Sequence, residues 1–101
     1  MKELYQMAEN TFAMDFSIAD VFGAHAVKDT YNRAFKEWKS DYKMLTALVV
    51  TLNHKIWEHY EATPRRQNLV ELYDSLWRQA QDYALDNLKG EELDYYYQIT
   101  D

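Results

Sequence analysis

Two histidines and two glutamates lie close together in the segment NHKIWEHYE, at His54, Glu58, His59 and Glu61. These side chains are typical zinc ligands, and a zinc-binding helix presents two histidines four residues apart. His54 and His59 are five residues apart, which turns them about 140° from each other around a helix. His54 and Glu58 share a face, but two ligands do not complete a site. The spacing therefore predicts an exposed helix surface rather than a metal centre.

Other catalytic arrangements are also missing from the sequence. Glu91, Glu92 and Asp94 follow Gly90 in a polar segment, where nothing predicts the desolvation that tunes a carboxyl group for acid–base work. No glycine-rich phosphate loop or GxSxG sequence occurs, and the absence of cysteine excludes thiolate nucleophiles, disulfides and cysteine zinc sites. We therefore expect a protein that is not an enzyme and that needs no cofactor or metal.

Basic side chains suggest a second kind of chemistry, the neutralisation of phosphates. They follow one side of a helix if that helix continues unbroken through residue 43, with Asp29 interrupting them. The residues are Lys28, Arg33, Lys36, Lys39 and Lys43. They are candidates for nucleic-acid binding, although the solvent face of an ordinary amphipathic helix explains the same pattern.

The segment SIADVFGAHAVKDTYNRAFKEWK, residues 17–39, resembles the second helix-turn-helix of the arabinose-regulator family of transcription factors. The matching positions are Ile18, Ala19, Val21, Gly23, Tyr31, Arg33, Phe35 and Lys36. The resemblance implies a hydrophobic frame and a DNA-facing second helix. A small DNA-binding accessory protein is therefore an alternative function.

Three consecutive tyrosines, Tyr95, Tyr96 and Tyr97, stand near the end of the sequence. Successive helical residues are turned by about 100°, so one helix face cannot bury all three. We expect Leu93 and one or two tyrosines to fold back near Leu85. The remaining tyrosine then forms an aromatic protein-binding patch with a tryptophan, beside an acidic rim from Glu91, Glu92 and Asp94. The candidate protein-binding residues are Trp57, Trp77, Leu85, Tyr95, Tyr96 and Tyr97.

The elements that position these residues are predicted to be helices. Only two glycines and one proline occur in 101 residues, and 48% of the residues are hydrophobic, which favours one all-α domain over residues 1–101. Apolar spacing predicts a helix over 2–14, a short helix over 17–23 that Ser17 caps and Gly23 ends, and an amphipathic helix over 24–38.

A central helix is predicted over 41–62, capped by Ser40 or Asp41. Its main apolar stripe comprises Tyr42, Leu45, Leu48, Val49, Leu52, Ile56 and Tyr60, and Val50 and Trp57 form a second line. After the loop TPRRQN, a last long helix begins at Thr63 or Asn68 and ends before Gly90, forming an antiparallel hairpin with the central helix. A short helix is favoured after Gly90, because a lone strand has nothing to pair with.

Net charge is −6 and is unevenly distributed, with −3 over residues 1–23, +3 over 24–67 and −6 over 68–101. The overall acidity disfavours general nucleic-acid binding. It also leaves a third alternative, an acidic inhibitor that mimics nucleic acid. The N-terminal segment lacks the apolar stretch of a secretory signal, and no apolar run approaches the roughly 20 residues of a membrane span. We therefore expect a cytoplasmic protein without membrane contact.

The segments LNHKIWEHYEA and LYDSLWRQAQDYALDNLKGEELDYY resemble small uncharacterised all-helical proteins carried on mobile elements of gut bacteria. That resemblance implies a cytoplasmic bacterial protein and indicates no activity. Together these observations predict an all-α bundle of four main helices, with a C-terminal helical hairpin and a short C-terminal helix. Its expected function is non-enzymatic protein interaction, with a protein partner or a second copy of the chain bound at the aromatic patch.

Overall fold

The computed structural model describes the backbone of residues 2–100 and, within them, the side chains of residues 4, 6–64 and 66–100. Over residues 2–100 the chain forms six α-helices, one 3-10 turn and no strand, which confirms the all-α prediction. The elements are α1 (Lys2–Thr11), α2 (Asp15–Phe22), α3 (Ala24–Trp38), α4 (Tyr42–Glu58), η1 (Pro64–Arg66), α5 (Gln67–Asn87) and α6 (Glu91–Thr100).

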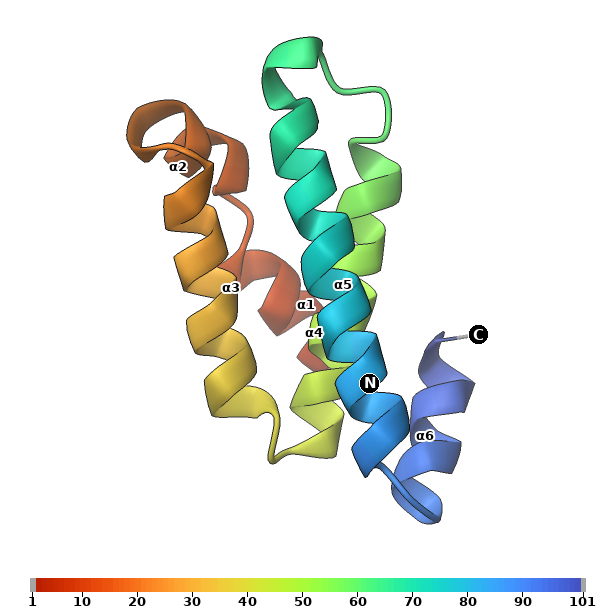
Figure 1. Cartoon of the computed structure of the whole chain (residues 1–101). Coiled ribbons are helices and arrows are strands. Elements are labelled where there is room, and N and C mark those ends of the chain that lie inside the picture. Colours follow the sequence, from red (N-terminus) through yellow and green to blue (C-terminus); the bar gives the residue numbers. More distant parts are fainter. Residues whose placement is uncertain (1, 101) are drawn as a thin grey trace.

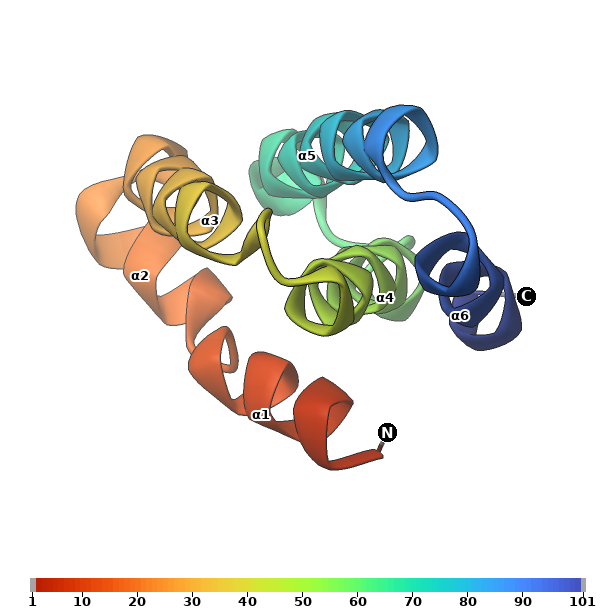
Figure 2. The ribbon, with the colours of Figure 1, turned by 90° about the horizontal axis from the view of Figure 1, so that it is seen from below.

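Helix α4 occupies the middle of the bundle, as its two apolar lines predicted. Seen along the helices, α4 is surrounded by α1, α3, α5 and α6 (Figure 2). Its Leu45, Leu48 and Leu52 are among the most deeply buried side chains of the molecule. A helix that is apolar on more than one side needs neighbours on each of those sides.

Helices α4 and α5 form the predicted antiparallel hairpin (Figure 1). Helix α4 ends at Glu58, four residues before the predicted boundary, and α5 begins at Gln67 after the 3-10 turn. Pro64 disfavours a helical conformation for the residue before it, and Thr63 is accordingly extended, with φ −57° and ψ 155°. The Gln67 side chain closes the connection by donating a 2.7 Å hydrogen bond to the carbonyl of Ala62.

Asp41 caps α4, as one of the two predicted alternatives. Its side-chain oxygen accepts hydrogen bonds from the backbone amides of Lys43, at 3.0 Å, and Met44, at 3.4 Å. This cap requires the chain to leave the helical conformation between α3 and α4. The two helices are therefore separate, and the unbroken helix through residue 43 that a single basic stripe requires is not formed.

Helix α2 begins at Asp15, two residues before the predicted cap, so that Ser17 lies inside the helix. No side chain caps the start of α2. Gly23 ends α2 as predicted and leads directly into α3, with φ 92° and ψ 163°. That conformation is open to glycine and strained for other residues, which explains how a single residue joins two helices.

Helix α1 packs across α4, and the residues that follow α1 enter the core. The helix ends at Thr11, three residues before the predicted boundary, and the next residue, Phe12, is buried. The Phe12 ring stacks on Tyr31 with centroids 3.9 Å apart and meets Trp38 edge-on at 6.1 Å. The N-terminal segment is therefore part of the bundle's core.

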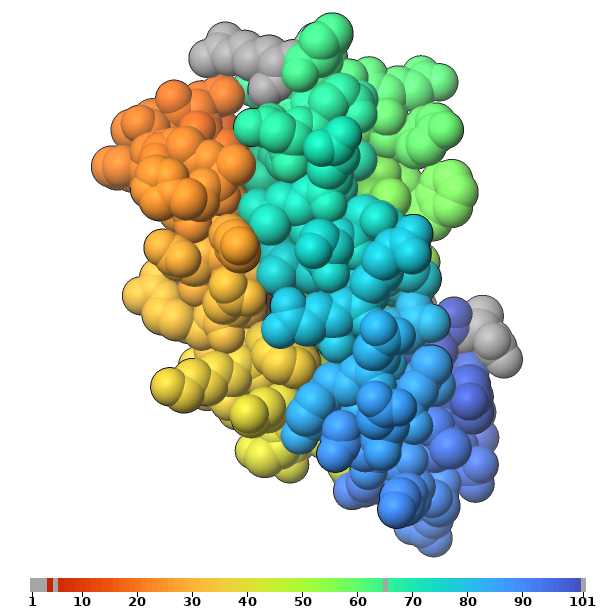
Figure 3. Space-filling view, viewed as in Figure 1, coloured from red at the N-terminus to blue at the C-terminus, as the bar shows by residue number. Residues whose placement is uncertain are grey.

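Helices α3 and α5 lie side by side along one face of the molecule, and α6 packs beside the end of α5 (Figure 3). The buried face of α5 follows the predicted spacing. It comprises Leu69, Val70, Tyr73, Leu76, Ala80 and Ala84. The predicted four main helices correspond to α1, α3, α4 and α5, with α2 and α6 as the short additions.

Candidate functional site

Helix α6 places the three consecutive tyrosines in three different environments. Tyr96 points into the bundle and is buried, whereas 47% of the Tyr97 surface is exposed. Tyr95 is half-buried, and its ring meets Tyr42 edge-on with centroids 5.2 Å apart. The expected arrangement, in which one or two tyrosines fold back and another points outward, is therefore present.

A cleft of about 510 Å³ opens between α4, α5 and α6. Its walls include Asn53 and His54 of α4, Trp77, Gln81 and Leu85 of α5, and Tyr97 of α6. Four of the six residues predicted to bind a protein line this cleft, namely Trp77, Leu85, Tyr96 and Tyr97. The tertiary structure thus brings together residues that are up to 20 positions apart in the sequence.

Trp57 lies outside the cleft walls but continues the same side of α4. It follows Asn53 by four residues, and residues at this spacing share a helix face. Trp57 is 68% exposed and stacks on Tyr60, with ring centroids 5.9 Å apart. The prediction that Tyr60 belongs to the buried stripe is wrong, because α4 ends at Glu58 and Tyr60 lies in the exposed turn beyond it. Trp57, Tyr60, Trp77, Leu85 and Tyr97 are called the aromatic face below.

Acidic groups occur on the helices that carry the aromatic face. Glu91, Glu92 and Asp94 lie in the first turn of α6, whereas the cleft is lined by the last residues of that helix. Asp82 of α5 acts electrostatically on Tyr96, which lines the cleft. Burial raises the pKa of Tyr96 to about 12, and the charges of neighbouring Tyr97 and Asp82 act in the same direction.

A buried polar cluster lies elsewhere in the molecule, around Asp15. The Asp15 carboxyl group is only 3% exposed, and its Oδ2 accepts hydrogen bonds from the hydroxyls of Tyr31, at 2.7 Å, and Tyr73, at 2.9 Å. Burial raises the pKa of Asp15, while the two hydrogen bonds and the charges of Lys55 and His59 act to lower it. Because Tyr31 belongs to α3 and Tyr73 to α5, one carboxyl group holds three helices together.

Sequence reasoning missed this cluster. It places Tyr31 and Tyr73 on the buried faces of their helices, and a buried tyrosine hydroxyl needs a hydrogen-bond partner. That requirement is the signal that some polar group must enter the core. Which group it is, however, depends on how α2 packs against α3 and α5.

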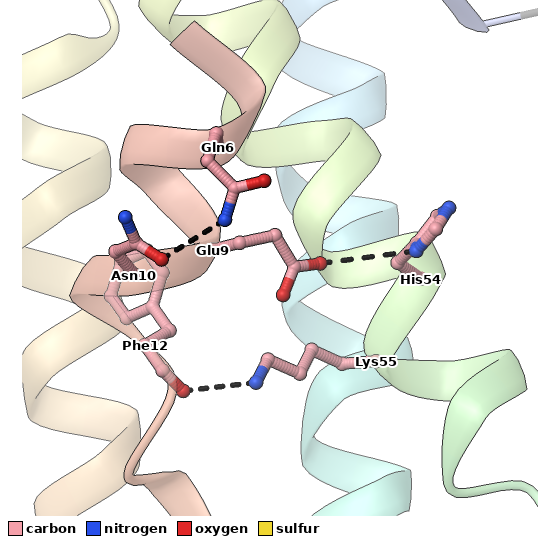
Figure 4. A network of polar contacts seen from close by, with 6 residues as sticks. All are labelled: Gln6, Glu9, Asn10, Phe12, His54 and Lys55. Atoms are coloured by element: carbon pink, nitrogen blue, oxygen red, sulfur yellow. Dashed lines mark hydrogen bonds and ion pairs between the residues drawn. The ribbon is translucent and has the colours of Figure 1, made fainter. Parts of the chain in front are cut away.

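A second set of polar contacts joins α1 to α4 (Figure 4). The buried Lys55 donates a 2.9 Å hydrogen bond from Nζ to the carbonyl of Phe12, just past the end of α1. Carbonyls at a helix C-terminus lack partners within the helix, so this lysine satisfies one of them. On the same side, Nδ1 of His54 lies 3.9 Å from Oε1 of Glu9. These contacts hold the end of α1 and the residue that follows it against the central helix.

The two histidines of NHKIWEHYE face different neighbours. His54 is directed at α1, as Figure 4 shows, whereas the ring of His59 lies 4.2 Å from that of Phe16 in α2. Burial lowers the pKa of His59, an effect that the charge of Glu58 opposes. Within the residues that the structure describes, no three histidine, aspartate or glutamate side chains are grouped as a metal ion would require.

The predicted nucleic-acid-binding residues are exposed but divided between elements. Lys28, Arg33 and Lys36 project from α3, Lys39 follows its end, and Lys43 belongs to α4. Arg33 and Lys36 line a shallow surface hollow together with Asp29 and Asn32. An acidic side chain therefore lies within the basic patch.

Comparisons with known proteins identify no relative for this fold and cleft. The chain matches no protein-family model, no curated protein and no solved structure. Among residues 2–100, no helix is both long enough and apolar enough to cross a membrane.

Proposed function

We propose that this protein is a non-enzymatic protein-interaction module that binds its partner through the aromatic face. The observation that carries the proposal is the cleft itself, where Trp77, Leu85 and Tyr97 from two helices converge around an open volume of about 510 Å³. Interface hot spots are enriched in tryptophan and tyrosine, and they cluster around pockets of this kind.

The energetics of burial support this assignment. Trp57 and Tyr60 are 68% and 63% exposed in the isolated chain and Tyr97 is 47% exposed, although an aromatic side chain carries a large apolar surface. Burying one such side chain in an interface contributes about 1.5 to 3 kcal/mol from the area removed from water. Tryptophan and tyrosine also have few rotatable bonds, so ordering them costs little entropy. Burial of these side chains by a partner would therefore contribute favourably to binding at this face.

Charge favours a basic partner over a second copy of the chain. Residues 68–101, a range that contains α6 and all but the first residue of α5, carry eight acidic and two basic groups. Two copies that met through this region would bring like charges together, which destabilises an interface. A partner with basic groups around an apolar anchor would instead be attracted to it. Self-association therefore becomes an outcome to be tested.

A second candidate function is nucleic-acid binding through α3. It is favoured by the joint exposure of Arg33, Lys36 and Lys39. Binding of that kind depends strongly on salt and is carried by lysine and arginine rather than by aromatic residues. The same experiment therefore separates the two candidates.

We would capture partners from native lysate, with and without nuclease, using three forms of the protein. These are the wild type, a Trp57→Ser/Tyr97→Ser variant and a Lys36→Ala/Lys39→Ala variant. Because all four side chains are exposed, both double variants should keep the fold, which circular dichroism would check. We expect to capture a protein partner whose recovery does not depend on nuclease treatment. The lysine variant should capture as much of it as the wild type, and the aromatic variant at least tenfold less.

Two results would contradict the proposal. In the first, the partner is lost with the lysine variant or after nuclease treatment but is still captured by the aromatic variant. This result would assign binding to α3 and to nucleic acid. Capture of the chain itself, with dimerisation in light scattering that the aromatic variant abolishes, would assign the face to self-association.

A further inference from the structure

The cleft contains a hydrogen-bond acceptor without a donor. Gln81 lines the cleft between Trp77 and Leu85 on α5, and its side-chain Oε1 is buried without a hydrogen-bond partner among the described residues. A buried acceptor in this condition is costly, and a donor that reaches it recovers that free energy. Oε1 is covered in the isolated chain, so a donor in the cleft reaches it only when the Gln81 side chain turns toward the cleft; the group that the cleft then requires is an N–H or O–H donor.

The charges around Gln81 favour a positively charged donor. Among the described residues that line the cleft, none is a lysine or an arginine. Asp82 directly follows Gln81, and the basic residue nearest to it in α5, Arg78, is engaged by Asp74 through a 2.9 Å hydrogen bond between Nε and Oδ2. No arginine or lysine of the cleft walls therefore competes with an incoming cation.

Aromatic rings form much of the surrounding surface. Trp77, Tyr96 and Tyr97 line the cleft, and Trp57 stands one helical turn along α4 from Asn53. The faces of tryptophan and tyrosine rings attract cations within about 6 Å, and arginine is bound in this way more often than lysine. The planar guanidinium group also stacks on a ring while its N–H groups donate hydrogen bonds at the edge.

We infer that the cleft binds a cationic side chain of the partner protein, with an arginine guanidinium stacked among the rings and donating a hydrogen bond to Oε1 of Gln81. This inference rests on the proposed function, because it names the anchor that the partner contributes to the aromatic face. The partner must therefore present an arginine with flanking apolar residues that cover Leu85 and Tyr97.

The direct test uses two blocked pentapeptides of alanine and leucine that differ at their central residue, which is arginine in one and citrulline in the other. Citrulline keeps the planar shape and loses the charge. Titration of the full-length, isotope-labelled protein by NMR should shift the indole N–H signal of Trp77 and the side-chain amide signals of Gln81. We expect the arginine peptide to bind about tenfold more tightly than the citrulline peptide.

A variant tests the role of Gln81 itself. Gln81→Met removes the acceptor at similar volume and should lower the affinity for the arginine peptide about fivefold. The affinity for the citrulline peptide should fall by less, because its ureido N–H groups also donate to Oε1 but without the positive charge. Gln79→Met, at an exposed position two residues away on the same helix, is the matched control and should change neither affinity. Equal affinity of the two peptides, or no effect of Gln81→Met on the arginine peptide, would overturn the inference.

Failure of this inference is distinguishable from failure of the proposed function. If Trp57→Ser/Tyr97→Ser abolishes capture of a protein partner but the arginine peptide shows no preference, the face binds proteins through apolar contacts alone. If the arginine peptide binds at Gln81 but the aromatic variant still captures every partner, cation recognition by the cleft stands and the proposed function is rejected.

Discussion

At the scale of single residues, the most consequential side chain in the bundle is Asp15. A carboxyl group removed from water is costly unless it is hydrogen-bonded, and each tyrosine hydroxyl in the core is costly without an acceptor. The contacts of Asp15 with Tyr31 and Tyr73 satisfy all three groups together. Because the three residues belong to α2, α3 and α5, their hydrogen bonds also select how these helices pack.

Removing either hydroxyl should therefore weaken the fold. Tyr31→Phe and Tyr73→Phe each keep the buried ring and leave Asp15 with one donor fewer, so we expect each to lower the free energy of unfolding by about 1 to 3 kcal/mol. Urea denaturation followed by circular dichroism measures this change. Tyr60→Phe, at an exposed position, serves as the control and should stay within about 0.5 kcal/mol of the wild type. Equal stability of all three variants would show that the Asp15 hydrogen bonds contribute nothing.

At the scale of elements, the junction between α2 and α3 depends on Gly23. Two helices meet there without an intervening loop, because Gly23 adopts φ 92° and ψ 163°. A Cβ atom at this position would also come within 3.0 Å of the His25 ring. Gly90, between α5 and α6, differs because it lies in the left-handed region at φ 61° with no neighbouring atom within 4 Å of a Cβ.

These two glycines provide a matched comparison. Gly23→Ala should lower the free energy of unfolding by about 1 to 3 kcal/mol, because its conformation is almost restricted to glycine and the added methyl group is crowded. Gly90→Ala should cost about 1 kcal/mol, since only the left-handed conformation opposes it. Denaturation curves of the two variants would show the ranking, and a larger loss at Gly90 would contradict the described geometry.

At the scale of the whole molecule, basic and acidic residues are concentrated on different helices. Helix α3, which carries exposed lysines and an arginine, lies on the opposite side of the bundle from α6 (Figure 1). The acidic α5 and α6 carry most of the aromatic face. The bundle measures 42 × 25 × 24 Å, so α6 lies farther from α3 than the screening length of about 8 Å at physiological salt, whereas α5 packs beside α3. A partner that approaches the aromatic face therefore meets mainly the acidic region.

The ionisation of Asp15 should make the folded protein less stable as pH rises, which is the opposite of the usual effect of an aspartate. Burial raises the pKa of Asp15 above its ordinary value of 3.8, although Tyr31, Tyr73, Lys55 and His59 all act to lower it. The folded protein therefore binds a proton at Asp15 more readily than the unfolded chain. This group's contribution to stability is fully present below about pH 3.8 and is lost as pH rises through the folded-state pKa.

The test measures the free energy of unfolding by urea denaturation between about pH 4 and pH 8, for the protein with Asp15 and for the Asp15→Asn variant. Both proteins carry His59→Gln, because burial lowers the pKa of His59 and its own contribution is lost as pH falls below 6.5. We expect the Asp15 protein to lose stability relative to Asp15→Asn as pH rises. A relative gain with rising pH would mean that the hydrogen bonds and nearby charges outweigh burial.

Much of this architecture was predictable, because the positions of the helices follow from the local spacing of apolar residues in the sequence. Apolar residues at helical intervals defined α3, α4 and α5, and Asp41 and Gly23 marked where α4 begins and α2 ends. Helix α5 ends at Asn87, before the stop predicted at Gly90. The predicted helix boundaries were wrong where contacts between distant residues decide the end of a helix. Helix α2 starts early, at the residue whose carboxyl group is bound in the core by Tyr31, and Tyr60 is exposed because α4 ends before it.

The candidate site was only partly accessible to such reasoning. An aromatic tail with one outward-facing tyrosine follows from the 100° rotation between helical residues. The meeting of Tyr97 with Trp77 and Leu85, and the unpartnered oxygen of Gln81 beside them, does not follow from the sequence. By itself the sequence determined an acidic, all-helical chain and the faces that its helices bury, because periodicity is a local property. Only the tertiary structure decided which faces meet, and hence where Asp15 is buried and where the cleft opens, because those contacts join residues far apart in the chain.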